Sequence, residues 1–321
     1  MRTDAICVLL MADEKVGKTV ATGYGVGNVA VFAGLPEALE PLRSIVGIKD
    51  PRIESALVIL DYIKVIDKVA TAWKGGSGAA RPIVVADDFG LAVARTEGNL
   101  RETAKPNQKG VINVFDIFST LKTQWSMVIN HAASKRVGLI MSVHATAPKE
   151  ATKDDPVPVP GRPQMPTAEL SKDIGRHPST IIFQRRTNLN APANSEFLCG
   201  SGVPRFMNGE PMYITGDRYG KAPPKMYPAL GELLRAQGFA ITRPPEVERF
   251  EGLIDQVARG IAAGQGTRTQ AAQFVIGHES TASEAPWVLR WILGDIFGRA
   301  DLLAFHSGQA LRDRMLSDYY G

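Results

Sequence analysis

Eight residues near the start of the chain have the types and spacing of a phosphate-binding loop. Residues 12–19 read Ala-Asp-Glu-Lys-Val-Gly-Lys-Thr, which is the pattern G-x-x-x-x-G-K-[ST] with alanine at its first position. In this pattern Gly17 lets the backbone approach phosphate, Lys18 reaches the β- and γ-phosphate oxygens, and the Thr19 hydroxyl binds Mg²⁺. Ala12 weakens the match, because glycine usually supplies conformational freedom at that position.

The loop predicts a site for a nucleoside triphosphate and its Mg²⁺. The alternative is an ordinary strand–turn–helix in which Gly-Lys-Thr occurs by chance. The predicted nucleotide-binding residues are Asp13, Glu14, Lys15, Val16, Gly17, Lys18, Thr19 and Val20.

Two adjacent aspartates form the second candidate group. Asp87 and Asp88 directly follow the apolar residues 83–86, and a strand that ends in acid carries the Mg²⁺-side carboxylate of phosphate-loop enzymes. We expect Asp87 to hold the metal ion through water and Asp88 to orient the attacking water. The alternative is a strand that ends in a surface Asp-Asp turn.

A third polar group ends the apolar stretch 137–144. Ser142 or His144 would sense the γ-phosphate if this strand lies beside the acidic one. The alternative for His144 is a hydrogen-bonded strand end without a role in nucleotide binding.

Alternating strands and helices must position these groups. The apolar run 5–11 is typical of a buried parallel strand, and the next segments repeat the alternation, which predicts a parallel α/β sheet. We expect strands at 28–33, 83–86 and 137–144, and helices at 19–24, 36–46, 53–73 and 111–135. The polar, basic segment 91–110 has no clear hydrophobic period, so we expect a loop there.

The second half of the chain changes character twice. Prolines make 145–178 irregular, after which 180–184 and 212–215 are predicted strands and 230–237 a short helix. From about residue 244 only helical patterns follow, at 247–263, 270–277, 284–297 and 301–317. We therefore expect a core over 1–243 and a helical C-terminal extension over 244–321.

Composition limits the class of protein. The chain has 321 residues, 44% of them hydrophobic, and a formal net charge of +4, which is compatible with a polyanionic partner. It contains no apolar run of about 18 residues, as a membrane span requires, and its beginning does not resemble a signal peptide. Its two cysteines form no disulfide framework. We expect a soluble, cytoplasmic protein without membrane partners.

Taken together, these segments resemble the RecA-like P-loop ATPases, in particular the phage-encoded Sak-type ATPases associated with recombination and annealing. The resemblance covers roughly residues 5–240 and rests on KVGKT, VVADD, LIMSVHA, PQMPTAELSKDIGRHPSTIIFQRRT and ITGDRYGKAP in this order. It implies a RecA-like core, hydrolysis of Mg-ATP between subunits of a ring or filament, and action on single-stranded DNA in phage recombination or replication. The C-terminal helices would bind a recombination, replication or assembly partner.

In this family, the loops after the acidic strand and after the polar-tipped strand line the DNA path. The resemblance places these loops at 95–110 and 145–176. Both contain spaced cations that would follow a phosphate backbone, although acidic residues dilute the charge. The cations are Arg95, Arg101, Lys105, Lys109, Lys149, Lys153 and Arg162.

The resemblance also implies two further catalytic residues. The sequence GDRYG is similar to the family's K-x-R-x-G hairpin, and Arg218 matches the arginine that reaches a neighbour's nucleotide. Gly216 stands where lysine is expected, unless Lys221 substitutes for it. Glu37 is the nearest counterpart of the family's catalytic glutamate, and Asp88 is the alternative to it.

Two other functions remain open from the sequence. One is a phage structural or assembly protein that keeps the core as a scaffold, with weak or no ATPase activity. The other is a nucleotide kinase whose lid is the Pro-rich loop, with Arg162 and Arg176 as lid cations.

Overall fold

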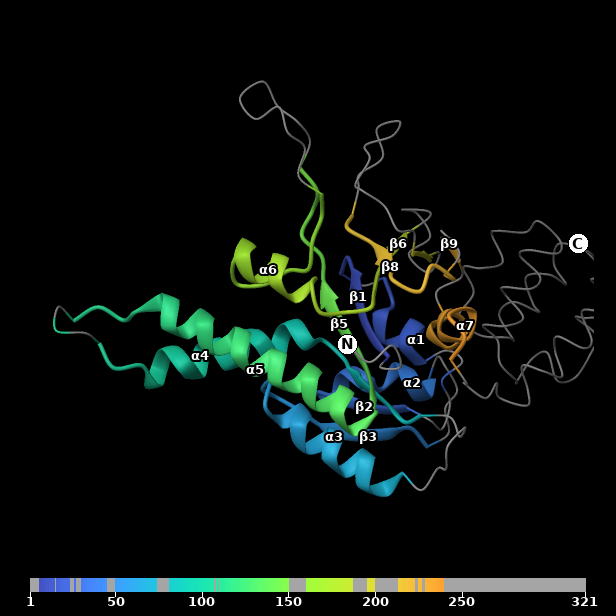
Figure 1. The fold of residues 1–321 in the computed structure, drawn as a ribbon, viewed down its shortest axis with the longest axis horizontal. Coiled ribbons are helices and arrows are strands. Elements are labelled where there is room, and N and C mark those ends of the chain that lie inside the picture. Colours follow the sequence, from blue (N-terminus) through green and yellow to red (C-terminus); the bar gives the residue numbers. More distant parts are fainter. Residues whose placement is uncertain are drawn as a thin grey trace, which may run out of the picture.

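The computed structural model describes a core of parallel strands and helices (Figure 1). The described residues are 6–14, 16–23, 26, 30–44, 50–73, 81–106, 108, 110–149, 160–186, 195–199, 213–222, 225–226 and 229–239. The predicted domain boundary at 243 and the predicted helices of 244–321 lie outside these residues.

The sheet places the strand before the phosphate loop at its centre. β1 (Cys7–Ala12) lies between β5 (Gly138–His144) and β6 (Thr180–Arg186) and is parallel to both. Beyond β5 follow β4 (Ile83–Ala86), β2 (Ala30–Gly34) and β3 (Arg52–Ser55), all parallel.

Short antiparallel strands lie beyond β6 or pair with it. β7 (Ser195–Leu198) and β8 (Gly216–Asp217) both pair with β6, and β9 (Lys225–Met226) pairs with β7. The order β3-β2-β4-β5-β1-β6-β7-β9 confirms the predicted α/β class with a mostly parallel sheet, as expected for a RecA-like P-loop core.

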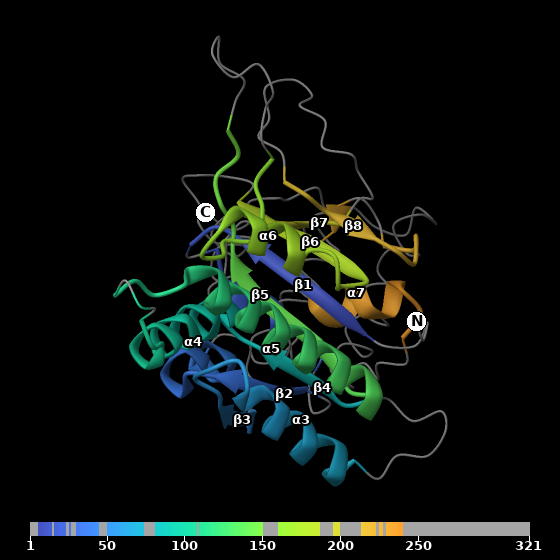
Figure 2. The same cartoon turned by 60° about the vertical axis from the view of Figure 1, so that its left-hand side comes forward.

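Helices cover the sheet because its central strands are apolar on both faces. All six residues of β1 are buried, and alternate ones point to opposite faces. α3 (Asp61–Ala72), α4 (Phe89–Thr103) and α5 (Val114–Lys135) pack on one face (Figure 2). α1 (Lys18–Gly23) packs against both α2 (Pro41–Ser44) and α7 (Leu230–Ala236).

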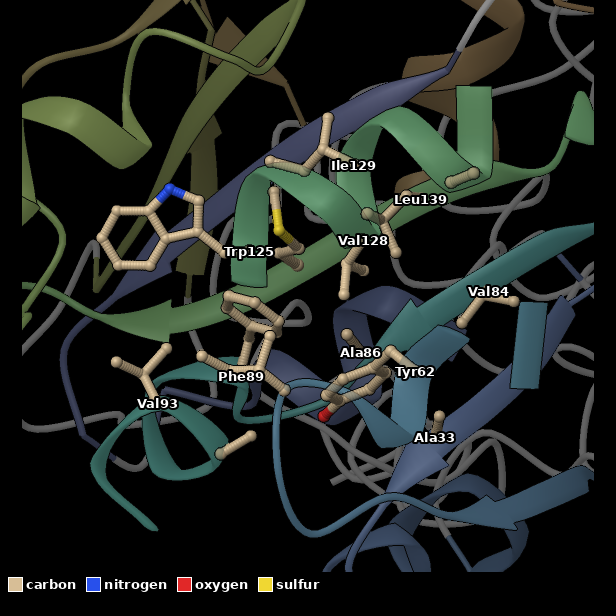
Figure 3. Packing of buried hydrophobic residues seen from close by; sticks show 14 of the residues in the cluster. Ala33, Tyr62, Val84, Ala86, Phe89, Val93, Trp125, Val128, Ile129 and Leu139 are labelled. Atoms are coloured by element: carbon tan, nitrogen blue, oxygen red, sulfur yellow. The ribbon is translucent and has the colours of Figure 1, made fainter. Parts of the chain in front are cut away.

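The core beneath α3, α4 and α5 is built from large side chains of these helices (Figure 3). Tyr62, Phe89 and Trp125 are fully buried there, and the rings of Tyr62 and Phe89 lie 5.5 Å apart. The residues that predicted a helix over 111–135 are all buried: Ile117, Leu121, Trp125, Val128 and Ile129. Among the described helices, none is long and apolar enough to cross a membrane.

The predicted helix 53–73 is wrong at its start. Residues 52–55 form the edge strand β3, paired with β2, and the helix begins only at Asp61. The Asp61 carboxylate accepts hydrogen bonds from the backbone N of Leu57 and Val58, so the first residue of the helix holds the turn that precedes it. Similarly, the predicted helix 36–46 is divided into the 3₁₀ helix η2 (Pro36–Leu39) and α2, which begins at Pro41.

The predicted loop 95–110 is also wrong, because α4 continues to Thr103. Its buried positions Ala92, Val93 and Thr96 are small, so they escaped a search for large apolar residues at helical spacing. The connection to α5 therefore begins at Ala104. In the 145–178 stretch, α6 (Ala168–Ile174) was likewise not predicted, and Thr167 caps it by accepting from Leu170 N.

The predicted strand 212–215 is largely replaced by β8. Tyr213 makes only an isolated bridge to Gly161, and the pairing with β6 starts at Gly216. β7 and β9 had no sequence prediction; they are only four and two residues long.

Candidate nucleotide-binding site

The phosphate loop follows β1 at the carboxyl edge of the sheet. Asp13 and Glu14 are exposed, Val16 is buried, and α1 begins at Lys18. Gly17 has φ 85°, a backbone conformation that L side chains rarely adopt, so glycine is needed here. The carbonyl of Gly17 accepts from Ala21 N at 2.9 Å, which starts the helix directly behind the loop. Lys15 lies outside the described residues.

Lys18 points toward the tip of the neighbouring strand. Its Nζ lies 3.0 Å from Nδ1 of His144, the last residue of β5, and donates to that nitrogen in the neutral tautomer whose proton is on Nε2. Burial lowers the pKa of Lys18, and the carboxylates of Asp88, Asp87, Glu14 and Asp13 oppose this effect. The lysine therefore stands half-buried among acidic groups at the entrance of α1.

Thr19 and Asp87 are in direct contact. Thr19 Oγ1 donates a 2.8 Å hydrogen bond to Asp87 Oδ2, and Ser142 Oγ donates a 3.0 Å bond to Asp87 Oδ1. Asp87 is only 7% exposed, and burial raises its pKa, although the two hydrogen bonds and Lys18 oppose that change. The first turn of α1, the end of β4 and the end of β5 thus meet at one buried carboxylate.

Ser142 serves the neighbouring aspartate as well. Its Oγ accepts from Asp88 N at 2.8 Å, so one fully buried hydroxyl holds both acidic residues. Ser142 thus bonds to both aspartates, whereas His144 at the tip of the same strand contacts Lys18.

Asp88 stands in the left-handed conformation, with φ 49° and ψ 52°, and caps α4. Its Oδ1 accepts from Leu91 N at 3.3 Å. This geometry directs the chain from the end of β4 into α4 while the carboxyl group remains partly exposed beside Asp87.

The oxygen ligands present fit a magnesium ion. Mg²⁺ in nucleotide sites takes one or two protein oxygens and completes its shell with phosphates and water. The Thr19 hydroxyl and the Asp87 carboxylate are adjacent and supply such oxygens. The described residues contain no group of three or more His, Cys, Asp or Glu arranged for a metal.

Glu37 lies on the same edge of the sheet as Asp87. It is exposed in η2, three residues beyond β2, and β2 and β4 are paired in parallel. The ends of β2 and β4 approach each other so closely that a Cβ added to Gly34 would lie 3.0 Å from the Asp87 carbonyl oxygen. Glu37 and Asp88 both remain candidates for orienting water.

Arg218 lies at the opposite edge of the sheet. Its backbone N donates to Ser179 O. The backbone N and the hydroxyl of Ser179 in turn donate to Cys7 O at the start of β1. Six residues of β1 separate this point from the loop, about 17 Å at the rise of a strand. Arg218 Nη2 donates to Arg176 O at 2.8 Å. The structure therefore does not bring Arg218 to the other predicted site residues of its own chain.

Asp217 explains the shape of the turn GDRYGK without reference to catalysis. This buried carboxylate accepts from the backbone N of Tyr219, Lys221 and Ala222, and from Gln237 Nε2. The aspartate thus fixes the backbone from which Arg218 projects.

Two residues that contact the loop were missed by the sequence analysis. Gln184 Nε2 donates to Val16 O at 2.8 Å, and Tyr213 OH donates to Asp13 Oδ1 at 3.4 Å. The Tyr213 ring stacks on Phe183, and burial together with Asp13 raises the pKa of Tyr213 to about 12. A polar residue at the end of the apolar run 181–183 was the available signal for Gln184.

Solved structures similar to this chain include those of the two proteins described below. No protein-family model matches the sequence, and no curated protein matches it. The crystal structure of the KaiC-like protein PH0186 from the archaeon Pyrococcus horikoshii is similar with 13% identity and a TM-score of 0.32, over 59% of this chain and 74% of that one. The assembled ATPase EscN of the type III secretion system of enteropathogenic E. coli is similar with 12% identity and a TM-score of 0.35, over 97% of this chain and 66% of that one. At these TM-scores neither similarity supports a functional assignment, which depends on the residues above.

Proposed function

We propose that the chain binds Mg-ATP at the loop 13–20 and hydrolyses it. The observation that carries this proposal is the contact between Thr19 and Asp87, 2.8 Å long, at the edge where the phosphate loop and the acidic strand meet. A chance Gly-Lys-Thr turn would not require a buried carboxylate beside its threonine, because burying that charge costs free energy.

The residues at this edge divide the work of holding the triphosphate. Backbone N–H groups around Gly17 cradle phosphate, and the Lys18 ammonium neutralises its negative charge. Thr19 and Asp87 hold Mg²⁺, which supplies neutralisation of the charge that develops on the phosphate oxygens. Binding of the anion also offsets the desolvation that lowers the Lys18 pKa.

A carboxylate beside the metal residues orients the attacking water. Asp88 adjoins Asp87 and is held through its backbone by Ser142. Glu37 is the alternative, because it is exposed at the same edge and is not part of a helix cap. Separate replacement of each carboxylate by its amide identifies which one turnover requires.

The active form is proposed to be a ring or filament of identical chains. Arg218 is too far from the phosphate loop of its own chain, so a catalytic role requires a neighbour's site. An arginine that spreads its positive charge over the γ-phosphate oxygens is worth several orders of magnitude in rate.

Single-stranded DNA is the proposed polymer on which the assembly acts, as in the phage recombination ATPases that the sequence resembles. Because α4 continues to Thr103, the first proposed DNA-contact region is the α4–α5 connection, where Lys105 is exposed. Phe115, 83% exposed in the first turn of α5, offers an aromatic face for base stacking. The second region is 145–176, which contains exposed Lys149; Lys109 and Lys153 lie outside the described residues.

The test is ATP hydrolysis with and without single-stranded DNA, together with the mass of the protein in solution. We expect Mg²⁺-dependent turnover, an oligomeric mass, and binding to DNA that weakens steeply with salt. A Phe115→Ala variant should lose DNA affinity and keep its basal turnover, and Met127→Ala, also exposed on α5, is its control. Absence of both turnover and DNA affinity at low salt would instead favour the scaffold protein.

A further inference from the structure

A buried glutamine connects the phosphate loop to the antiparallel part of the sheet. Gln184 is 1% exposed on β6 and lies in register with Ala12, the last residue of β1. Its Nε2 donates to Val16 O at 2.8 Å and to the Ser195 hydroxyl on β7 at 3.0 Å. The amide thus reaches from one strand to the loop beside it and to the strand on its other side.

The chemistry of the acceptor fixes the orientation of this side-chain amide. A backbone carbonyl can only accept, so the nitrogen of Gln184 and not its oxygen must face Val16 O. The remaining Oε1 is buried, and no donor among the described residues reaches it. A glutamine with an unpaired buried oxygen stabilises the fold less than an apolar side chain of the same size, because the buried oxygen has lost its hydrogen bonds to water.

The contact determines the direction of one peptide group in the loop. In a trans peptide the C=O of one residue and the N–H of the next point in opposite directions, and the described residues contain no cis bond. Because Gln184 holds the Val16 carbonyl on the β6 side, the N–H of Gly17 is turned away from β6. Gly17 accepts this geometry at φ 85°.

We propose that Gln184 is a positioning residue that aims the Gly17 N–H at the β-phosphate of the bound nucleotide. This inference rests on the proposed function, since it concerns the same loop. Ser195 contributes by holding the amide of Gln184 in place from the far side. The loop would then bind nucleotide in a preorganised form, without first having to order this peptide on binding.

The test replaces Gln184 by methionine, which keeps the volume and removes both donated hydrogen bonds. The chain contains a closely matched control, Gln237, which ends α7 and bonds to Thr180 at the other end of β6. Gln237 is 4% exposed, its Nε2 also donates two hydrogen bonds, to Thr180 Oγ1 and Asp217 Oδ1, and its Oε1 also has no partner among the described residues. Gln237→Met therefore reproduces the loss of packing and hydrogen bonding far from the loop.

The measurements are the dissociation constants for ADP and ATP by titration calorimetry and the melting temperature of each variant. ADP is the primary ligand, because it keeps the β-phosphate and lacks the γ-phosphate that a neighbour's Arg218 would contact. We expect Gln184→Met to weaken ADP and ATP binding by the same factor, about tenfold for one lost orienting hydrogen bond. The melting temperature of Gln237→Met should fall to a similar extent, and its dissociation constant for ADP should stay within about twofold of the wild-type value.

The outcomes separate the inference from the proposed function. A wild-type protein that binds neither nucleotide overturns the proposed function, and the inference falls with it. If the wild type binds and Gln184→Met binds equally well, or both variants weaken binding alike, only the inference is overturned. A loss confined to ATP also overturns it, because a peptide aimed at the β-phosphate affects both nucleotides.

A milder pair of variants covers the case in which Gln184→Met does not fold. Ser195→Ala leaves Gln184 intact and removes its second partner, so ADP binding should weaken about two- to threefold. Ser179→Ala is its control, since this hydroxyl donates to Cys7 O at the opposite end of β1. Equal ADP affinity of Ser195→Ala and Ser179→Ala would overturn the inference.

Discussion

The hydroxyl of Thr19 donates a 2.8 Å hydrogen bond to Asp87, although 68 residues separate them in the sequence. The strands that precede them, β1 and β4, are not neighbours, because β5 lies between these two strands. Ser142, on that intervening strand, donates to the other oxygen of the same carboxylate. The strand order therefore brings Thr19, the Asp87 carboxylate and the Ser142 hydroxyl to one point before any ligand binds.

Asp87→Asn should stabilise the fold at neutral pH and abolish Mg²⁺-dependent hydrolysis. Burial raises the pKa of Asp87, so the folded state favours the protonated form and the free energy of unfolding falls as pH rises through that pKa. Asparagine removes this cost, and its NH₂ can donate to the Thr19 hydroxyl. The melting temperature should exceed that of the wild type at pH 7–8, with a rise of about 2–4 °C per kcal/mol. The difference should vanish below about pH 3.9, the ordinary pKa of an aspartate, where the carboxyl group is protonated in both the folded and the unfolded state.

The control for this prediction has the opposite sign. Asp67 is half-buried, and hydrogen bonds from His131 and Lys135 lower its pKa, so its contribution to stability is present at neutral pH and lost on acidification. Asp67→Asn should therefore destabilise slightly at neutral pH and leave hydrolysis unchanged. A lower melting temperature for Asp87→Asn at pH 7–8 would contradict the account of the buried carboxylate.

Ser142→Ala should lower both stability and turnover. The change leaves Asp88 N and Asp87 Oδ1 without their shared partner in a buried place, which costs about 1–3 kcal/mol. Because both aspartates lose their orientation, kcat should fall more than nucleotide affinity does. Thermal melting and steady-state kinetics measure the two effects, and Ser134→Ala, an exposed helical serine that bonds to His131 O, is the control. Wild-type kcat in a folded Ser142→Ala protein would show that Ser142 does not position the acids.

The loop and the acidic strand could be recognised from sequence because each is a local pattern. Lys18 and Thr19 follow an apolar run, Asp87 ends another, and parallel strands bring their carboxyl ends to one edge. The polar tip of β5 was recognised in the same way, but Ser142 and His144 could not be told apart. Their difference is a matter of direction: Ser142 faces Asp87, and His144 faces Lys18.

The remaining features depend on contacts that no local pattern encodes. Gln184 and Val16 are 168 positions apart, and Tyr213 and Asp13 are 200 apart, so only the fold joins them. α4 was missed because its buried residues after Phe89 are small: Ala92, Val93 and Thr96. β3 was read as helix because its four residues derive their strand conformation from pairing with β2.

Lys18→Ala should abolish ATP turnover without loss of stability. The ammonium is partly buried, and burial lowers its pKa, so the folded protein carries a desolvated charge that alanine removes. We expect kcat to fall at least about a hundredfold, as for removal of one charged stabilising group, and a melting temperature no lower than that of the wild type. Lys64→Ala, an exposed lysine on α3, should hydrolyse normally. Hydrolysis at the wild-type rate by Lys18→Ala would end the assignment of this loop.

Arg218→Ala should also lose turnover, by about 10³-fold if the guanidinium reaches the γ-phosphate of a neighbour. The stronger test is to mix it with Lys18→Ala, because the two changes lie at opposite edges of the sheet, about 17 Å apart along β1. In a mixed assembly with shared sites, a chain with intact Lys18 receives Arg218 from its partner at about a quarter of the interfaces, so activity reappears on mixing two inactive proteins. Arg43→Ala, an exposed arginine on α2, is the control for loss of a surface cation. If the mixture stays inactive while both variants assemble to the wild-type mass, Arg218 does not act across subunits. In that case Arg218 has a structural role, which includes its bond to Arg176 O beside the turn held by Asp217.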